Sequence, residues 1–162
     1  MPPRPLIPLD QLDLDRVLAD VDAIREHNPQ RFEMEQLTRI IHFVREKEEV
    51  AGVLEIGDEP FWARGHVPAY PLMPGVMMLE AAAQLCSWAV RQVYDKEEYG
   101  HRFFGFGAID DVKFRGIVRP GDALLLLGRA IEHRARRAVF ATQGFVEGRM
   151  VFQANITGMW LL

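Results

Sequence analysis

The feature that most constrains the fold is the segment from Gly75 to Val93, which is apolar on nearly every side when it is drawn as a helix. A helix of this kind belongs in a protein core rather than on a surface. The small residues Ala81, Ala82 and Ala83 allow its neighbours to approach closely. A curved sheet can cover such a helix, so the rest of the chain must supply a broad one.

The remaining sequence supplies strand-like runs on both sides of this segment. They cover residues 37–44, 50–56, 103–114, 123–133, 139–146 and 150–161. Most of the breaks between them are short and turn-like, which favours antiparallel neighbours. We therefore predict an α+β fold in which about six antiparallel strands wrap one long central helix.

The N-terminal residues are expected to form a separate segment. Residues 1–9 are rich in proline and predict an extended arm. Apolar residues then recur at helical spacing at Leu14, Val17, Leu18, Val21 and Ile24, and together with Asp13 as N-cap they predict a helix over 14–27. We assign residues 1–28 to this arm and helix and residues 29–162 to the main domain, whose length suits a single core.

Composition argues against several classes of function. A net charge of −4 without a basic stripe argues against a nucleic-acid-binding protein. The apolar segment is short for a membrane span and contains Glu80 and Gln84, so we expect no span. No signal peptide is visible, and the single Cys86 cannot form an intrachain disulfide, which predicts a cytoplasmic location. The sequence has no metal, nucleotide or flavin motif, so we predict no cofactor.

One short stretch carries residues suited to acid–base chemistry. His66 precedes Glu80 by fourteen positions, and a proline-rich loop stiffens the chain between them. A lone carboxylate in an apolar helix is costly unless it is paired or used. Gly75 and Val76 stand at the expected helix start, where unpaired N–H groups stabilise negative charge on a carbonyl oxygen. Taken alone, each feature also has a structural interpretation. His66 could be a core histidine, Glu80 could form a salt bridge, and Gly75 could simply begin a helix.

Two blocks of sequence carry a more specific signal. They are residues 65–84, GHVPAYPLMPGVMMLEAAAQ, and residues 107–122, GAIDDVKFRGIVRPGD. Both resemble the β-hydroxyacyl-acyl-carrier-protein dehydratases of type II fatty-acid synthesis, and the resemblance covers roughly residues 29–162. It implies the hotdog fold, with His66 as catalytic base and Glu80 as its acidic partner across a dimer interface. Glutamate rather than aspartate at position 80 indicates the branch that only dehydrates.

The implied reaction is dehydration of (3R)-3-hydroxyacyl-acyl-carrier-protein to trans-2-enoyl-acyl-carrier-protein. The chain departs from the family pattern at Val67, Ala69 and residues 29–34, positions that line or support the acyl tunnel. Two alternatives stay open: a hotdog enoyl-CoA hydratase or thioesterase, and a catalytically silent acyl-binding subunit. The resemblance also implies a homodimer, with a trimer of dimers left open.

An acidic carrier protein calls for a basic rim at the mouth of the site. The candidates for this contact are Lys113, Arg115 and Arg119, at the end of the second block's strand and in the turn after it. The cluster Arg134, Arg136 and Arg137 is another candidate. The alternative interpretation of each residue is a solvated charge at a strand end or a turn.

Overall fold

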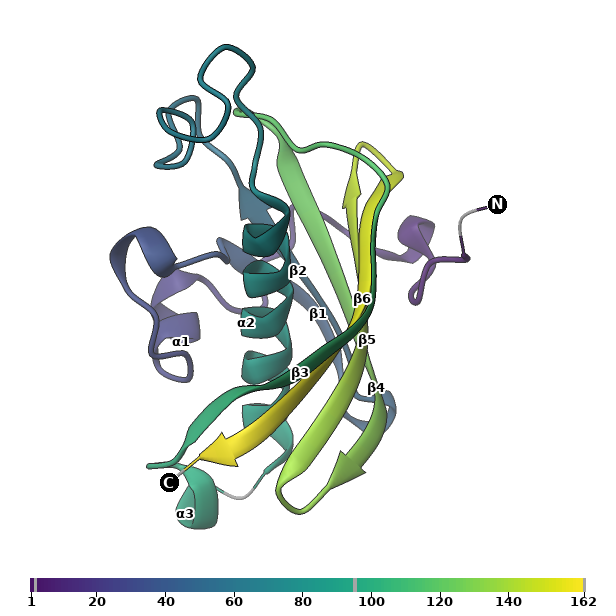
Figure 1. Cartoon of the computed structure of the whole chain (residues 1–162). Coiled ribbons are helices and arrows are strands. Elements are labelled where there is room, and N and C mark those ends of the chain that lie inside the picture. Colours follow the sequence, from purple (N-terminus) through teal and green to yellow (C-terminus); the bar gives the residue numbers. More distant parts are fainter. Residues whose placement is uncertain (2, 95, 162) are drawn as a thin grey trace.

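The computed structural model describes residues 1, 3–94 and 96–161, and its described part is built on one long helix and one sheet (Figure 1). The helix is α2 (Gly75–Val93). The strands are β1 (Arg39–Val44), β2 (Glu49–Glu55), β3 (Phe103–Phe114), β4 (Ala123–Arg134), β5 (Arg137–Val146) and β6 (Arg149–Leu161). All neighbours are antiparallel, in the order β1-β2-β4-β5-β6-β3. The predicted α+β architecture is therefore confirmed.

Shorter elements connect these parts. They are α1 (Val21–Arg25), α3 (Lys96–Tyr99) and the 3-10 turns η1 (Leu9–Gln11), η2 (Phe32–Met34) and η3 (Arg45–Lys47). No helix of the described residues is long and apolar enough to cross a membrane.

Helix α2 begins and ends where predicted, at Gly75 and Val93. Pro74 precedes it with a fixed φ, and Tyr94 leaves it with extended backbone angles. The sheet covers one side of α2, and the chain around α1 covers another (Figure 1). This two-sided cover explains why the segment is apolar almost all round. Close approach to the sheet depends on Gly52 of β2, where a Cβ would lie only 2.8 Å from Leu85 Cδ1.

The prediction of a helix over residues 14–27 is wrong for most of its length. Only Val21–Arg25 is helical, and its N-cap is Asp20, whose side chain accepts a hydrogen bond from the Ala23 N–H at 2.9 Å. Before it, Leu18 N–H donates to the Ile40 carbonyl at 2.8 Å, and Ala19 bridges to the same residue. Pairing with the open edge of β1 satisfies these backbone groups. This contact with β1 therefore overrides the helical pattern of the sequence.

The N-terminal arm packs against the outer face of the sheet, where Figure 1 shows the chain beginning. The Gln143 side chain holds it from β5, since its Oε1 accepts from Leu6 N–H at 2.8 Å and its Nε2 donates to the Arg4 carbonyl at 3.0 Å. Ile7 is only 2% exposed and joins a second, smaller apolar cluster on this face. The arm thus covers apolar surface that the sheet turns away from α2.

Replacing Ile7 by alanine is expected to lower the free energy of unfolding by about 2–4 kcal/mol, because the change empties a buried site. Urea denaturation followed by circular dichroism measures the difference. Leu14→Ala is the matched control, since Leu14 is 46% exposed and should cost less than about 0.5 kcal/mol. Equal costs for the two variants would contradict a packed arm.

Candidate active site

The loop before α2 fixes His66 in one tautomer. Its Nδ1 lies 2.8 Å from the carbonyl oxygen of Leu72. A carbonyl oxygen only accepts, so Nδ1 carries the proton and Nε2 of the neutral ring keeps a free lone pair. The His66 N–H also donates to the Trp62 carbonyl at 2.8 Å, and Met73 N–H donates to the Val118 carbonyl at 2.8 Å. An anchored imidazole with a free ring nitrogen is what a general base requires.

The backbone next to His66 is strained. Val67 has a φ of +52°, in the left-handed region that a β-branched residue rarely adopts. Such a conformation costs of order 1–3 kcal/mol and is frequent at functional sites. The rest of the loop must therefore hold this geometry in place.

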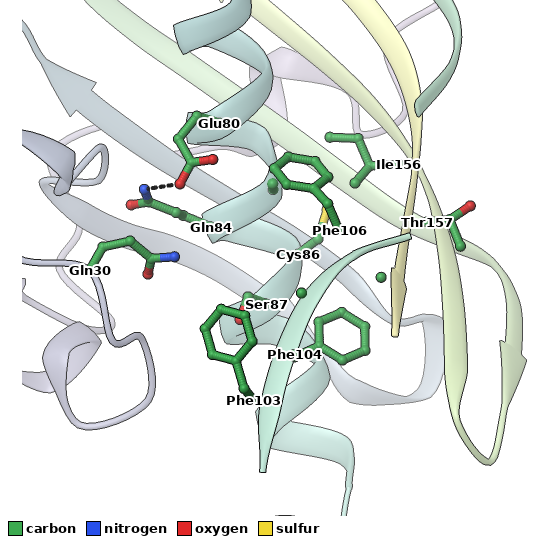
Figure 2. A pocket seen from close by; sticks show the side chains of 13 residues that line it. Gln30, Glu80, Gln84, Cys86, Ser87, Phe103, Phe104, Phe106, Ile156 and Thr157 are labelled. Carbon is green, nitrogen blue, oxygen red and sulfur yellow. Dashed lines mark hydrogen bonds between the residues drawn. The ribbon is translucent and has the colours of Figure 1, made fainter. Parts of the chain in front are cut away.

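Glu80 is positioned by Gln84, one helical turn further along α2. Gln84 Nε2 donates to Glu80 Oε1 at 2.7 Å and to the Met34 carbonyl at 2.7 Å, while its Oε1 accepts from Gln36 N–H at 2.9 Å. The two backbone partners determine which end of the amide is nitrogen, so it cannot flip. Figure 2 shows the other carboxylate oxygen of Glu80 pointing toward Phe106.

A pocket of about 220 Å³ lies beside Glu80, between α2, β3 and the end of β6 (Figure 2). Its lining is largely apolar and aromatic and includes Glu80, Gln84, Cys86, Phe103, Phe104 and Phe106. Gln30 also lines it, one of the positions in 29–34 at which the sequence departs from the dehydratase pattern. Burial raises the pKa of the Cys86 thiol, so this group stays protonated and is no nucleophile. Within the described chain, no group of three or more His, Cys, Asp or Glu could hold a metal ion.

The predicted oxyanion site corresponds to the first amides of α2. No side chain caps this end of the helix, and neither Gly75 nor Val76 N–H has a backbone acceptor among the described residues. The bare Cα of Gly75 lies against Phe114, because a Cβ there would come within 2.7 Å of its ring. Glu80 follows five residues later, roughly 7.5 Å along the helix axis. These N–H groups can therefore donate hydrogen bonds to the carbonyl oxygen of a bound ligand whose adjacent carbons extend toward Glu80.

The described chain does not join the predicted acid–base pair. His66 bonds Leu72 and is absent from the pocket lining, whereas Glu80 bonds Gln84 and lines the pocket. No hydrogen bond or ion pair within the described residues connects the two side chains. Within one copy of the chain, the two predicted residues therefore have different partners, and only Glu80 lines the pocket.

The three candidate carrier-protein contacts do not form one patch. The Arg119 guanidinium donates to the Tyr70 hydroxyl and lies 5.4 Å from the centre of its ring, beside the loop that carries His66. Arg115 donates to Gln153 Oε1 at 2.9 Å. Lys113 is the register partner of the same Gln153, and both line a hollow with residues of the N-terminal arm, on the outer face of the sheet. Arg119 is therefore the candidate nearest to the proposed chemistry.

Comparison with known proteins identifies the family. The model of the FabA-like domain family matches residues 28–155. The chain belongs to the FabA-like domain family. A "3-hydroxyacyl-[acyl-carrier-protein] dehydratase FabZ" from Streptococcus gordonii is 34% identical over 140 residues, which cover 86% of this chain and 96% of that protein. The protein of the same name from Lawsonia intracellularis is 35% identical over 138 residues, covering 85% and 90%. The resemblance seen in the two sequence blocks is confirmed.

Solved structures confirm the hotdog fold of this FabA-like chain. A dehydratase heterocomplex, ApeI:P from Xenorhabdus doucetiae, matches with a TM-score of 0.66 and 13% identity, covering 86% of this chain and 91% of that chain. A thioesterase mutant from Pseudomonas aeruginosa matches with a TM-score of 0.65 and 16% identity, covering 92% and 100%. At such low identity these matches bear on the fold alone.

Sequence reasoning gave Gln84 no role in this FabA-like site. The signal was present, since residues four apart on a helix lie on one face and an amide can bond a carboxylate there. Its backbone partners in residues 34–36 come from a distant segment, so the fixed orientation of the amide could be found only in the structure.

Gln84→Glu is expected to lower kcat at least tenfold at neutral pH. The change replaces the amide nitrogen that donates to Glu80 by an acceptor oxygen, so two carboxylates face each other. Lowering the pH should recover part of the loss relative to the native chain, because a shared proton restores the hydrogen bond. Gln92→Glu is the control: the same change on α2, at a side chain that bonds the Trp88 carbonyl. A pH profile of Gln84→Glu that parallels the native one would contradict the positioning role.

Proposed function

We infer that this chain dehydrates 3-hydroxyacyl thioesters of acyl carrier protein to the trans-2-enoyl thioesters in fatty-acid biosynthesis. The observation that carries the inference is the 34% identity that extends over 96% of a FabZ dehydratase. The site supports it, because His66 offers a free ring nitrogen and Glu80 stands at the rim of an apolar pocket. This chemistry needs no group beyond the thioester of the substrate.

We further propose that two copies of the chain build each site. Strand β3 lies at the edge of the sheet and presents Phe106, Ile109, Val112 and Phe114 exposed. An apolar edge of this kind is a surface for pairing with another chain. In the proposed homodimer, His66 of one copy would face the pocket and Glu80 of the other, which accounts for the absence of a hydrogen bond between them within the described residues of one chain.

The proposed reaction divides proton transfer between the two side chains. His66 Nε2 removes the C2 proton while the Gly75 N–H, with Val76 N–H as the weaker donor, stabilises negative charge on the thioester oxygen. The electron pair left on C2 forms the C2–C3 double bond as the C3–O bond breaks. Glu80 gives its proton to the leaving hydroxyl, which departs as water. Exchange with solvent then returns a proton to Glu80 and removes one from His66.

Carrier-protein docking is proposed to involve the basic residues Lys113, Arg115 and Arg119, of which Arg119 lies nearest to the loop with His66. Arg119→Ala is expected to raise KM for carrier-protein thioesters about two- to fivefold, since one exposed charge contributes modestly. KM for coenzyme A thioesters should change little, and added salt should remove the difference. Equal increases in KM on both carriers would contradict the docking role.

A cytoplasmic location and a trimer of dimers stay predictions.

The activity is tested by following absorbance of the conjugated thioester as the native protein hydrates trans-2-enoyl thioesters on carrier protein and on coenzyme A. We expect hydration of both, with carrier protein preferred. Release of free thiol without hydration would favour a thioesterase instead. Absence of turnover at every chain length by folded protein would contradict the dehydratase and favour a silent acyl-binding subunit.

A further inference from the structure

We propose that Phe104 is the end wall of the acyl pocket and sets a medium-length limit, with room for about eight carbons beyond the reacting ones. The proposal rests on the function above, since it assumes that the acyl chain of the thioester enters the pocket beside Glu80. It adds a residue that determines specificity and a class of substrate.

The residues of α2 that line the pocket extend from Glu80 to Ser87. In Figure 2, Glu80 lies at one end, Phe106 and Cys86 follow, and Phe103 and Phe104 lie at the other end. Ser87 lines the pocket seven residues after Glu80. At 1.5 Å per residue, the helix rises by roughly 10 Å between the two. A chain bound with its reacting carbons at Glu80 would therefore run toward Phe104.

Phe104 is fixed from both sides. It is 9% exposed, and its ring packs edge-on against Trp160 with centroids 5.0 Å apart. Trp160 in turn packs on Tyr99, with centroids also 5.0 Å apart. From the sheet, the ring rests on the bare backbone of Gly158, where a Cβ would lie only 2.0 Å from Phe104 Cε1. With aromatic rings behind it and backbone beneath it, the ring cannot withdraw to admit a longer chain.

Two estimates of capacity agree. Each residue of an extended polypeptide contributes three backbone bonds and spans about 3.3–3.6 Å. An extended acyl chain therefore advances about 1.2 Å per bond. A path of roughly 10 Å therefore holds about eight carbons. A cavity of about 150 Å³ holds the six carbons of benzene. In that proportion, the pocket of about 220 Å³ holds about nine carbons.

Two substitutions should move the limit in opposite directions. Phe104→Leu shortens the end wall, so the preferred chain should become longer by about two carbons. Gly158→Ala places a methyl group where the ring now rests, which pushes the ring into the pocket and should make the preferred chain shorter. Since one methylene in an apolar pocket changes kcat/KM by 10-fold or more, each shift should be at least tenfold in the ratio of longer to shorter substrates.

The test measures kcat/KM for thioesters of four to sixteen carbons with the native chain and both variants. Thermal-shift titration with saturated fatty acids of the same lengths gives a second readout that needs no turnover. Phe140→Leu is the control, because Phe140 is even more buried than Phe104, at 1% against 9% exposed, and does not line the pocket. Its length profile should match the native one.

Opposite shifts in the two variants, in turnover or in fatty-acid binding, would support the end wall. Unchanged profiles in both folded variants would overturn it, as would a native optimum at sixteen carbons. Shifts in fatty-acid binding without turnover by any form would keep the end wall and overturn the dehydratase, so the two failures are distinguishable.

Discussion

His66→Ala is expected to lower kcat/KM for hydration about 10²–10⁴-fold, the usual contribution of a positioned general base. In the proposed mechanism, no other side chain acts as the base that removes the C2 proton. The fold should survive, because within the described residues the half-buried imidazole makes a single hydrogen bond, to the Leu72 carbonyl. Such a bond contributes about 0.5–1.5 kcal/mol.

The measurement is the absorbance assay, with circular dichroism and a thermal melt to establish that the variant is folded. His101→Ala is the matched control, since His101 is exposed in a turn after α3 and lines none of the pocket around Glu80. A folded His66→Ala variant that keeps native turnover would show that another group is the base.

Glu80→Gln is expected to have an effect of the same order, about 10²–10⁴-fold. The new amide has nearly the shape of the carboxylate and can still accept from Gln84 Nε2, so orientation is kept. It has no acidic proton for the leaving hydroxyl, so only the proton transfer is lost.

Glu80→Ala is the companion variant, because it removes both the proton and the contact with Gln84. If Glu80 is the acid, the two variants should be similarly impaired. If the glutamine variant kept most of the native kcat while the alanine variant lost it, Glu80 would only position the substrate or His66. Both protons would then pass through the imidazole.

The sequence allowed the central layer of the fold to be predicted because its patterns are strong and local. The apolar run from Gly75 to Val93 has a proline before it and no breaker inside, so its helix has the predicted ends. The β3 strand was also predicted at its observed bounds, Phe103–Phe114. The other strands differ only at their ends, where hydrogen bonds to neighbours decide the boundary.

The errors and omissions have a common cause, which is contact between distant segments. Residues 14–20 carry a helical pattern, but the free edge of β1 pairs with Leu18 and Ala19 instead. The arm was predicted as extended, and nothing in its own sequence indicates that Gln143 of β5 holds it. The orientation of Gln84 likewise depends on backbone groups of residues 34 and 36.

The candidate site shows the same division. The residue types and their order predicted a base, an acid and an amide site, and the structure supplies a free ring nitrogen, an oriented carboxylate and uncapped amides. That His66 and Glu80 have different hydrogen-bond partners within one copy could not be predicted from their spacing. In our proposal the contact is made between subunits, and such a contact has no periodicity in the sequence of one chain.

The most direct test of a dehydratase site shared between two copies is complementation between inactive variants. Purified His66→Ala and Glu80→Ala chains are mixed, allowed to exchange subunits, and assayed for hydration of enoyl thioesters. Random pairing makes half of the dimers mixed, each with one complete site of two, so activity should return to about one quarter of the native value. A mixture that exchanges subunits and stays inactive would contradict the shared site.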